Sequence, residues 1–319
     1  MSYLNFLYCF DKNYNIQGYL AINSLLNNVN EKINIFIIHE NQITFKKFKQ
    51  KLEVNKNLNK IEIYDFNNEN IDFIFPNVIG SHVSNATYYR IFASDYLPKN
   101  LNYYIYLDSD IFCIHNPVNE FKFFLEKLES TNYIIGATKE FDRLEPNIHH
   151  FERLSLKGKM YFNAGMLIVN HQEWMKLNVK IKLLDLLITL NNKLVFWDQD
   201  LLNVYFDNSF LSVTKHLNYN LFLTEKNYFS KFETSQDVKL VHYAGSYKPW
   251  SVRGAAHARS KIYQYMFKKE FNKRFHIVSK WRFSNLIELL KIVFSKKIIK
   301  IDNPLIYIKQ ALFSIIFKQ

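Results

Sequence analysis

Apolar runs alternate with amphipathic stretches near the N-terminus, and this order constrains the fold more than any other feature. Residues 3–10, 33–39 and 61–66 are predicted to form buried strands, and residues 19–28 and 44–58 between them have helical spacing. A β-α-β-α-β order predicts a parallel sheet with helices on its faces. Ligands of such sheets bind at the carboxyl ends of the strands. We therefore expect an α/β fold whose functional residues directly follow strands.

The alternation of strands and helices continues further along the chain. Residues 138–160 interrupt it, because they are polar; we expect an irregular segment there and, from that polarity alone, a lid over the site. The predicted helices lie at 87–97, 121–128, 180–190 and 198–206, and the predicted strands lie at 133–137, 166–169 and 240–243.

The composition is that of a globular protein with a large core. The chain has 319 residues, of which 48% are hydrophobic, so disorder is excluded for most of it. Cys9 and Cys113 stand in apolar segments without the spacing of a zinc site, which indicates buried thiols in a reducing compartment. The sequence shows neither a leader pattern nor an apolar window of about 18 residues. We therefore expect a cytoplasmic protein.

The net charge of +12 is confined to the C-terminal part. Residues 251–319 contain 15 Lys and Arg against 3 Asp and Glu, whereas residues 1–250 contain 26 of each kind. A neutral body argues against nucleic-acid binding, and a basic tail is typical of a segment on an anionic surface. We therefore expect a catalytic domain at 1–250 and a basic helical tail at 251–319.

The tail is amphipathic as well as basic. Residues 283–301 and 305–318 carry apolar side chains on one helical side and basic ones on the other. This pattern predicts helices that lie on the anionic cytoplasmic leaflet. The alternative is a helix that packs in the core through Leu305, Ile308, Leu312 and Ile315.

The strongest chemical signal is a pair of carboxylates after a strand-like run. Residues 101–107 are mostly apolar and end in Asp108-Ser109-Asp110. A buried strand does not place two charges at its tip without a partner for them. Two hard oxygen ligands in one turn suit Mg²⁺ or Mn²⁺, and such a metal suits a diphosphate. Taken alone, the pattern also fits a solvated turn.

Three further segments carry polar groups, each with a structural alternative. Asn163, followed by Ala and Gly before a predicted strand, can bond a hydroxyl-rich ligand, or the three residues form a tight turn. Asp198 either caps a helix or, with Gln199 and Asp200, faces sugar hydroxyls. Arg90 lies on a predicted helix as a surface or a ligand-binding arginine.

Residues 241–250 form the densest cluster of candidate groups. His242 can give an imidazole to the metal of the two aspartates, and otherwise is an ordinary core or surface histidine. Lys248, beyond the turn at Gly245, can neutralise a leaving phosphate as a point charge. The segment therefore combines groups suited to a metal and to a phosphate.

Together these segments resemble glycosyltransferase family 8, which includes bacterial lipopolysaccharide α-galactosyl- and α-glucosyltransferases and glycogenin. The resemblance runs from about residue 3 to residue 250 and depends on motifs that occur in the family's order. These motifs are residues 10–14, 87–90, 106–110, 161–165, 198–200 and 242–250.

The resemblance implies a GT-A fold, a Rossmann-like domain with a mixed, mainly parallel sheet. It also implies a UDP-glucose or UDP-galactose donor and Mn²⁺, with Mg²⁺ as the alternative metal. The implied metal ligands are Asp108, Asp110 and His242. The implied donor-binding residues are Asp11, Asn13, Tyr14, His82 and Val83 at the uridine, and Arg90, Ser109, Asn163, Ala164, Gly245 and Lys248 at the sugar and diphosphate.

The resemblance further implies transfer with retention of configuration and catalytic roles for Gln199, Asp198 and Lys248. Gln199 would lie near the anomeric carbon, but a carboxamide is a poor nucleophile, and Asp198 is the charged alternative. A front-face mechanism, in which the leaving UDP helps to deprotonate the acceptor, needs no protein nucleophile. Glu140 stands where some relatives have Asp, which changes the acceptor side.

Three functions follow from these observations. The first is a hexosyltransferase that extends a lipopolysaccharide or lipooligosaccharide at the inner face of the cytoplasmic membrane. The second is a glycogenin-like or other protein- or soluble-glycan-modifying transferase, and the third is an inactive membrane-bound scaffold. The basic tail favours the glycolipid acceptor, and the intact aspartates, His242 and Lys248 argue against the scaffold. Glucose and galactose differ at one hydroxyl, so both donors stay open.

Overall fold

The protein divides into two compact units. In the computed structural model the first unit comprises Met1–Tyr219 with Val238–Leu240, and the second comprises Asn220–Asp237 with Val241–Gln319. The structure describes residues 3–317 apart from 68–74, 76–83, 191–192, 225, 227, 229–234, 279–282 and 296.

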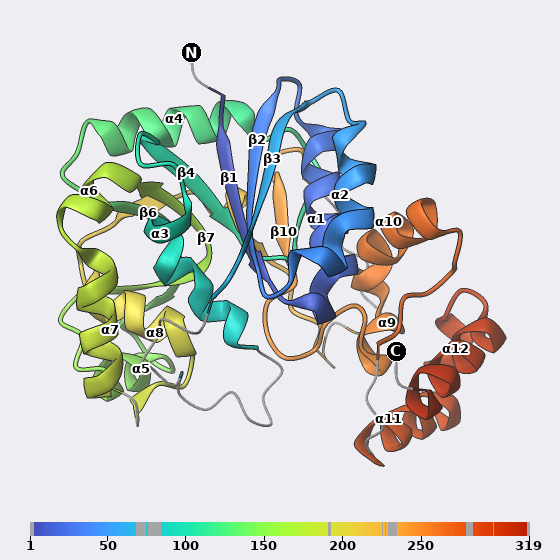
Figure 1. Cartoon of the computed structure of the whole chain (residues 1–319). Helices are drawn as coiled ribbons and strands as arrows, with labels where there is room; N and C mark the ends of the chain where they lie inside the picture. The colour runs from blue at the N-terminus through green and yellow to red at the C-terminus, as the bar shows by residue number, and fades with distance from the viewer. Residues whose placement is uncertain are drawn as a thin grey trace. The chain divides into compact units, whose positions relative to one another are not determined.

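The first unit is built on a seven-stranded sheet with the order β3-β2-β1-β4-β7-β6-β8 (Figure 1). The strand β7 runs antiparallel to both neighbours, and the other pairs are parallel. The expected α/β fold with a mixed, mainly parallel sheet is therefore confirmed. The strands are β1 (Asn5–Phe10), β2 (Ile33–His39), β3 (Leu58–Asp65), β4 (Tyr103–Leu107), β6 (Ile135–Asp142), β7 (Met160–Asn170) and β8 (Leu211–Val213).

Helices cover both faces of this sheet, which explains why β1 and β2 are mostly apolar and are buried along almost their whole length. On one face Phe6 meets Phe121 of α4 edge to face at 5.6 Å, and on the other Leu7 and Cys9 join the core of α7 and α8. The helices are η1 (Lys12–Tyr14), α1 (Asn15–Asn28), η2 (Gln42–Phe45), α2 (Lys46–Glu53), η3 (Asn85–Phe92), α3 (Ala93–Tyr96), α4 (Val118–Glu129), α5 (Ile148–Arg153), α6 (His171–Lys176), α7 (Val179–Leu190), α8 (Trp197–Tyr205) and η5 (Lys215–Leu217).

Two predictions about the middle of this unit are wrong. Residues 138–160 are not one irregular segment, because they contain the end of β6, the helix α5 and the first residue of β7. Asn163 and the two residues after it do not form a turn before a strand, because β7 begins at Met160. Pairing with β4 and β6 imposes the strand on residues of low intrinsic β-propensity.

A second, three-stranded sheet has the order β5-β10-β9. Its strands are β5 (Ile111–Cys113), β9 (Tyr219–Asn220) and β10 (Leu240–His242), and the division between the units passes through β9 and β10. Within the first unit, the Ile114 amide donates to the Lys239 carbonyl at 2.9 Å. The chain therefore enters β10 from a position fixed beside the end of β5.

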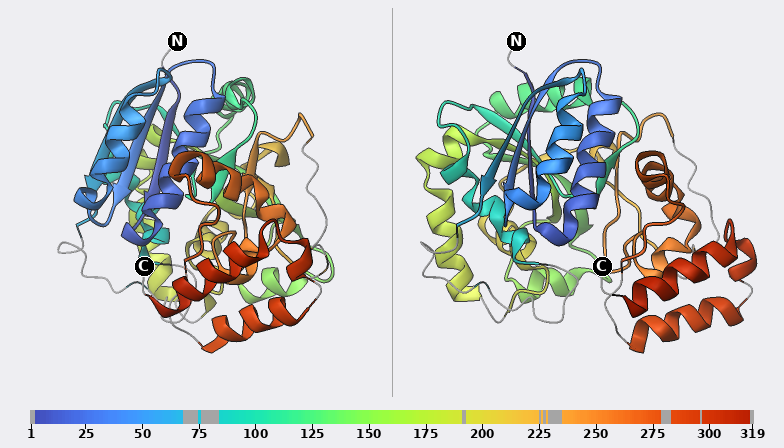
Figure 2. Two further views of the ribbon diagram at one scale, coloured as in Figure 1. Left: turned by 90° about the vertical axis from the view of Figure 1, so that its right-hand side faces the viewer. Right: turned by 45° about the vertical axis from the view of Figure 1, so that its right-hand side comes forward.

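The second unit is mainly helical, and α11 and α12 lie side by side within it (Figure 2). Leu289 of α11 and Tyr307 and Ile315 of α12 share a core, whereas Leu305 is 81% exposed and Leu312 is also exposed. Among the described residues, no helix is long and apolar enough to cross a membrane. The helices are α9 (Val252–Ala255), η6 (Ala258–Ser260), α10 (Lys261–Phe271), α11 (Phe283–Phe294), η7 (Ile298–Lys300) and α12 (Pro304–Ile316).

Candidate active site

The two predicted metal-binding aspartates lie in a turn at the carboxyl end of β4. The Asp108 amide donates to the Gly165 carbonyl of β7 at 2.8 Å, and the Ile111 amide donates to the Asp108 carbonyl at 3.1 Å. The side chain of Asp108 is 28% exposed, whereas Ser109 and Asp110 are buried. Strand pairing therefore fixes this turn at the edge of the sheet, with Asp108 partly open to solvent.

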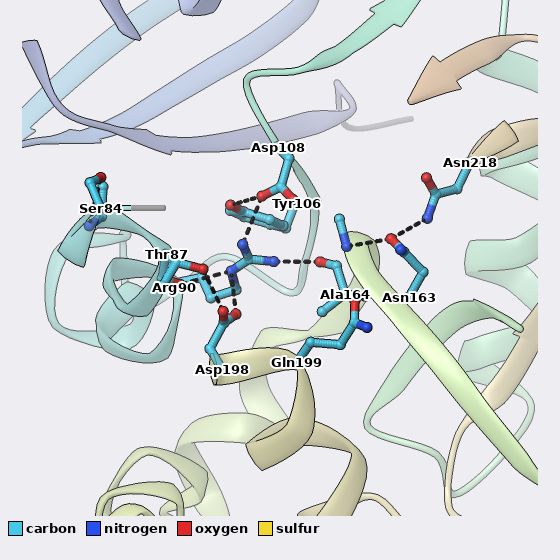
Figure 3. Close-up of polar contacts among 12 residues, drawn as sticks. Ser84, Thr87, Arg90, Tyr106, Asp108, Asn163, Ala164, Asp198, Gln199 and Asn218 are labelled. Atoms are coloured by element: carbon cyan, nitrogen blue, oxygen red, sulfur yellow. Dashed lines mark hydrogen bonds and ion pairs between the residues drawn. The ribbon is translucent and has the colours of Figure 1, made fainter. Parts of the chain in front are cut away.

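Arg90 is the centre of the polar cluster (Figure 3). Its side chain is 6% exposed, and its guanidinium lies 2.7 Å from Asp108 Oδ1 and 3.0 Å from Asp198 Oδ2. It also donates to the Ala164 carbonyl and lies over the Tyr106 ring, 4.0 Å from the centroid. Burial acts to lower the pKa of Arg90, but the two carboxylates raise it above its ordinary value. The surface alternative for Arg90 is therefore wrong.

Asp198 is a buried carboxylate on the first turn of α8. Thr87 donates from its hydroxyl to Oδ1, whereas Oδ2 lies 3.0 Å from Arg90 Nε as an ion pair, because the Nε proton is donated to the Thr87 carbonyl at 3.1 Å. Burial raises the pKa of Asp198 to about 6, although Arg90 and the Thr87 hydroxyl act in the opposite direction. The N-cap of α8 is Phe196, so the alternative in which Asp198 caps this helix is wrong.

The raised pKa of Asp198 predicts a pH-dependent contribution to stability. Between about pH 4 and pH 6 the folded state holds a proton that the unfolded state has released, so the contribution of Asp198 to the free energy of unfolding falls as the pH rises. We expect the stability of wild type relative to Asp198→Asn to fall by about 2–3 kcal/mol across this window in metal-free buffer. Urea unfolding at stepped pH measures it.

The matched control for that series is Asp95→Asn, which removes a carboxylate from an exposed ion pair with Lys180 at 2.9 Å. Subtracting its profile removes the general effect of losing one carboxylate. A difference between wild type and Asp198→Asn that stays constant from pH 4 to pH 7 would contradict the expectation.

Gln199 and Asn163 are held by one carboxylate, that of Glu140 on β6. Glu140 Oε2 accepts from Asn163 Nδ2 at 2.9 Å and from Gln199 Nε2 at 3.1 Å. Gln199 Oε1 accepts from the Ala164 amide at 3.0 Å, and Asn163 Oδ1 accepts from the Gly165 amide at 2.9 Å. These bonds fix the orientation of both carboxamides against β7.

Two residues of the cluster lie within the sequence motifs but are not among the predicted site residues. The Tyr106 hydroxyl donates to Asp108 Oδ1 at 2.5 Å, and the Thr87 hydroxyl donates to Asp198. Thr87 is three residues before Arg90, and Tyr106 is two residues before Asp108 on the same side of the strand. This spacing is the sequence signal that identifies them.

Two asparagines outside the predicted site stabilise the cluster through hydrogen bonds to β7. Asn203 Oδ1 accepts from the Phe162 amide at 2.8 Å, and its Nδ2 donates to the Phe162 carbonyl at 2.9 Å, which ties α8 to β7. Asn218 Nδ2 donates to Asn163 Oδ1 at 2.9 Å. Asn203 is four residues after Gln199 on one helix face, whereas no pattern in the sequence marks Asn218.

The predicted uridine-binding residues follow β1. Asp11 caps η1 by accepting from the Asn13 amide at 2.8 Å. Burial and the charges of Asp110, Asp11 and Asp108 raise the pKa of the Tyr14 hydroxyl, which indicates that these groups lie near one another. The ends of β1 and β4 thus meet at one edge of the sheet. Two predicted uridine contacts lie outside the described residues, His82 and Val83.

His242, Gly245 and Lys248 belong to the second unit. His242 is the buried last residue of β10, and its carbonyl accepts from the Leu221 amide at 2.7 Å. Gly245 has φ of 84°, the left-handed region that favours glycine. Lys248 Nζ donates to the Tyr243 carbonyl at 2.8 Å across this turn. The motif after β10 is therefore a tight turn that fixes the lysine stem.

Asp108 and Asp110 of the first unit offer two carboxylates to a divalent metal ion, and His242 of the second unit, the third predicted ligand, offers an imidazole. Two carboxylates and one imidazole are a donor set that Mn²⁺ accepts and that also serves Mg²⁺. Arg90 and Tyr106 both bond Asp108 Oδ1, so with respect to the described residues Oδ2 is the oxygen that remains for a metal. The residues present therefore fit a divalent cation.

Known proteins resemble this chain in sequence and in fold. Residues 5–254 match the model of glycosyl transferase family 8. A glycosyltransferase of Haemophilus influenzae is 27% identical over 297 residues, which cover 89% of this chain and 84% of that protein. The lipopolysaccharide 1,2-glucosyltransferase of Escherichia coli is 33% identical over 179 residues, 52% of this chain and only 49% of the relative.

The fold agrees with that of a solved transferase. The galactosyltransferase LgtC, solved in complex with donor and acceptor sugar analogues, matches with a TM-score of 0.67 over 83% of this chain and 96% of its own, at 19% identity. This likeness confirms the expected GT-A fold. Because the family model spans most of the sequence, the chain belongs to glycosyltransferase family 8.

Proposed function

We propose that the protein is a Mn²⁺-dependent, retaining hexosyltransferase that moves glucose or galactose from a UDP-sugar to a lipopolysaccharide or lipooligosaccharide acceptor. One observation carries the proposal: the buried guanidinium of Arg90 joins Asp108, a candidate metal ligand, to Asp198, a candidate sugar ligand. A site that handles a nucleoside diphosphate sugar needs a metal for the diphosphate beside polar groups for the hexose.

In this proposal the donor lies along the carboxyl ends of β1 and β4. Asp11, Asn13 and Tyr14, with His82 and Val83, bind the uridine. Asp108, Asp110 and His242 would hold the metal, which would supply a Lewis acid for the diphosphate of the UDP leaving group. Ser109, the turn at Gly245 and the ammonium of Lys248 add polar contacts and positive charge at the leaving group.

The hexose lies against β7 and the start of α8. Arg90, Asn163, Ala164, Asp198 and Gln199 surround it in this proposal. The carboxylate of Asp198 is buried, bonded at Oδ1 by the Thr87 hydroxyl and held at Oδ2 by the ion pair with Arg90, and the Gln199 carbonyl accepts from the Ala164 amide. Neither group is free to attack the anomeric carbon without giving up these bonds. We therefore favour the front-face route, in which the leaving UDP helps to deprotonate the acceptor.

The glycolipid acceptor accounts for the C-terminal segment. Residues 251–319 carry 15 basic and 3 acidic side chains, and α11 and α12 expose Phe294, Leu305 and Phe313. Basic and apolar groups together favour binding at the inner face of the cytoplasmic membrane, with residues 1–250 as the catalytic domain. The Escherichia coli relative, a lipopolysaccharide 1,2-glucosyltransferase, supports an acceptor of this class.

The proposal predicts metal-dependent hydrolysis or transfer from one UDP-hexose. We expect purified protein to release UDP from UDP-glucose or UDP-galactose with Mn²⁺ and at least about 100-fold more slowly with a chelator, since metal loss removes several kcal/mol of charge stabilisation. UDP release with each donor measures this. No release from either donor, together with no change of Tm by UDP and Mn²⁺, would refute the transferase assignment.

A further inference from the structure

The second unit contains a basic cavity to which the transfer reaction assigns no role. It has a volume of about 420 Å³ and lies between α10, the end of α9, the loop after α10 and the segment after η7. One carboxylate, Asp302, is among its described lining residues, and it pairs with Lys261 at 3.1 Å. The cationic side chains that line it are Lys261, Lys268, Arg274 and Lys300.

The wall that α10 provides follows from helical spacing. Lys261, Gln264 and Lys268 recur at intervals of three and four residues and therefore share one face of the helix. Gln264 is buried, and its Oε1 accepts from the His276 amide at 2.8 Å. This bond holds the loop that carries Arg274 against α10. Lys261, Lys268 and Arg274 are therefore carried by two segments that a buried hydrogen bond joins.

A histidine on the wall contributes no charge. The Arg259 amide donates to His257 Nδ1 at 3.1 Å, and His257 Nε2 lies 3.2 Å from the Thr224 carbonyl. With Nδ1 as acceptor, Nε2 carries the proton, so the ring is neutral. The positive charge of the cavity therefore comes from lysine and arginine, which bind phosphoryl groups as point charges and as a planar fork.

We propose that this cavity binds the phosphoryl group of a phosphorylated saccharide or of a phospholipid headgroup. Four cations against one carboxylate suit an anionic group: a phosphate monoester on a sugar carries about −1.5 to −2 charges, and the phosphodiester of a phospholipid carries about −1. The cavity is far larger than phosphate needs and lies in the range of about 300–1,000 Å³ of small-molecule sites. Tyr228, Phe275 and Ile301 also line the cavity, and they would contact the ring or headgroup that carries the phosphate.

Calorimetry of the full chain tests this binding with glucose 6-phosphate, glucose and inorganic phosphate as probes. We expect glucose 6-phosphate to bind, glucose not to bind, and the double variant K268A/K300A to bind glucose 6-phosphate at least about tenfold more weakly, because two lysine charges at the phosphate are lost. Lys269→Ala is the matched control, since Lys269 is the next residue on α10 and does not line the cavity. It should bind as wild type does.

Vesicles distinguish the two sources of the phosphoryl group. Phosphatidylcholine vesicles with and without phosphatidylglycerol are sedimented with each variant. The lipid headgroup is supported if K268A/K300A loses phosphatidylglycerol-dependent binding, K269A keeps it, and the wild-type protein does not bind glucose 6-phosphate. No binding of either probe that depends on Lys268 and Lys300, or an equal loss in K269A, overturns the proposal.

Two further measurements keep this test interpretable. The Tm of each variant shows whether it is folded. If K268A/K300A is not folded, a K268E variant replaces it. UDP release is measured on the same proteins. Because the described residues that line the cavity all belong to the second unit, an inactive wild-type protein that still binds the probe would refute the transfer reaction and leave this site standing.

Discussion

Replacement of Arg90 by alanine is expected to lower the free energy of unfolding by about 3–5 kcal/mol. The guanidinium is 6% exposed and contacts both Asp108 and Asp198, so its removal leaves one partly buried and one fully buried carboxylate without their cation. The Ala164 carbonyl also loses its donor. Urea unfolding at pH 7 measures the change, and the transferase should lose its activity together with its stability.

Arg90→Lys is the informative companion variant. Lysine keeps the charge but not the planar fork that reaches two carboxylates and a carbonyl, so we expect an intermediate stability. Arg253→Ala serves as a control, because Arg253 is a partly exposed arginine over the Tyr247 ring. A stability of Arg90→Ala within about 1 kcal/mol of wild type would show that the guanidinium does not neutralise the two carboxylates.

Replacement of Asp110 by alanine is expected to lower Mn²⁺-dependent UDP release by about 10²–10³-fold. The carboxylate is buried at the end of β4 and belongs to the group that could hold a divalent ion. Loss of one ligand weakens the binding of the metal ion, which would neutralise the charge of the diphosphate. UDP release as a function of Mn²⁺ concentration separates weaker metal binding from a slower reaction.

Asp142→Ala is the matched control for Asp110→Ala. The carboxylate of Asp142 forms an exposed ion pair with Lys139 at 2.9 Å at the end of β6, so its loss should leave the rate unchanged. If Asp110→Ala releases UDP at the wild-type rate with the wild-type Mn²⁺ dependence, Asp110 does not hold the metal. The Tm of both variants excludes a folding defect as the cause.

The sheet and its edge could be predicted because the signals are local. Residues 33–39 are apolar except at Asn34 and His39, so both faces of the strand are largely apolar, as in a covered parallel sheet. The carboxylates at 108 and 110 directly follow another mostly apolar run. The edge where β1 and β4 end follows from that order alone. Identifying the donor and metal groups there required the resemblance of six separate motifs.

Other features depend on partners that are distant in sequence. Arg90 can be buried as a cation because it pairs with Asp108 and Asp198, which are 18 and 108 residues away in the sequence. The polar end of β6 pairs with β7 although Lys139 has little preference for strands, because its partner Phe162 on β7 satisfies its backbone groups. A pattern read along one segment does not contain these contacts.

The single cation between two carboxylates also links two binding events. A divalent ion that draws charge from Asp108 changes the electrostatic field that Asp198 experiences through Arg90, and a hexose that bonds Asp198 acts on Asp108 by the same route. Such coupling is reciprocal. If the bound metal changes the affinity for the sugar by some factor, the bound sugar changes the affinity for the metal by the same factor. Cooperativity between cofactor and donor would then originate in one buried side chain.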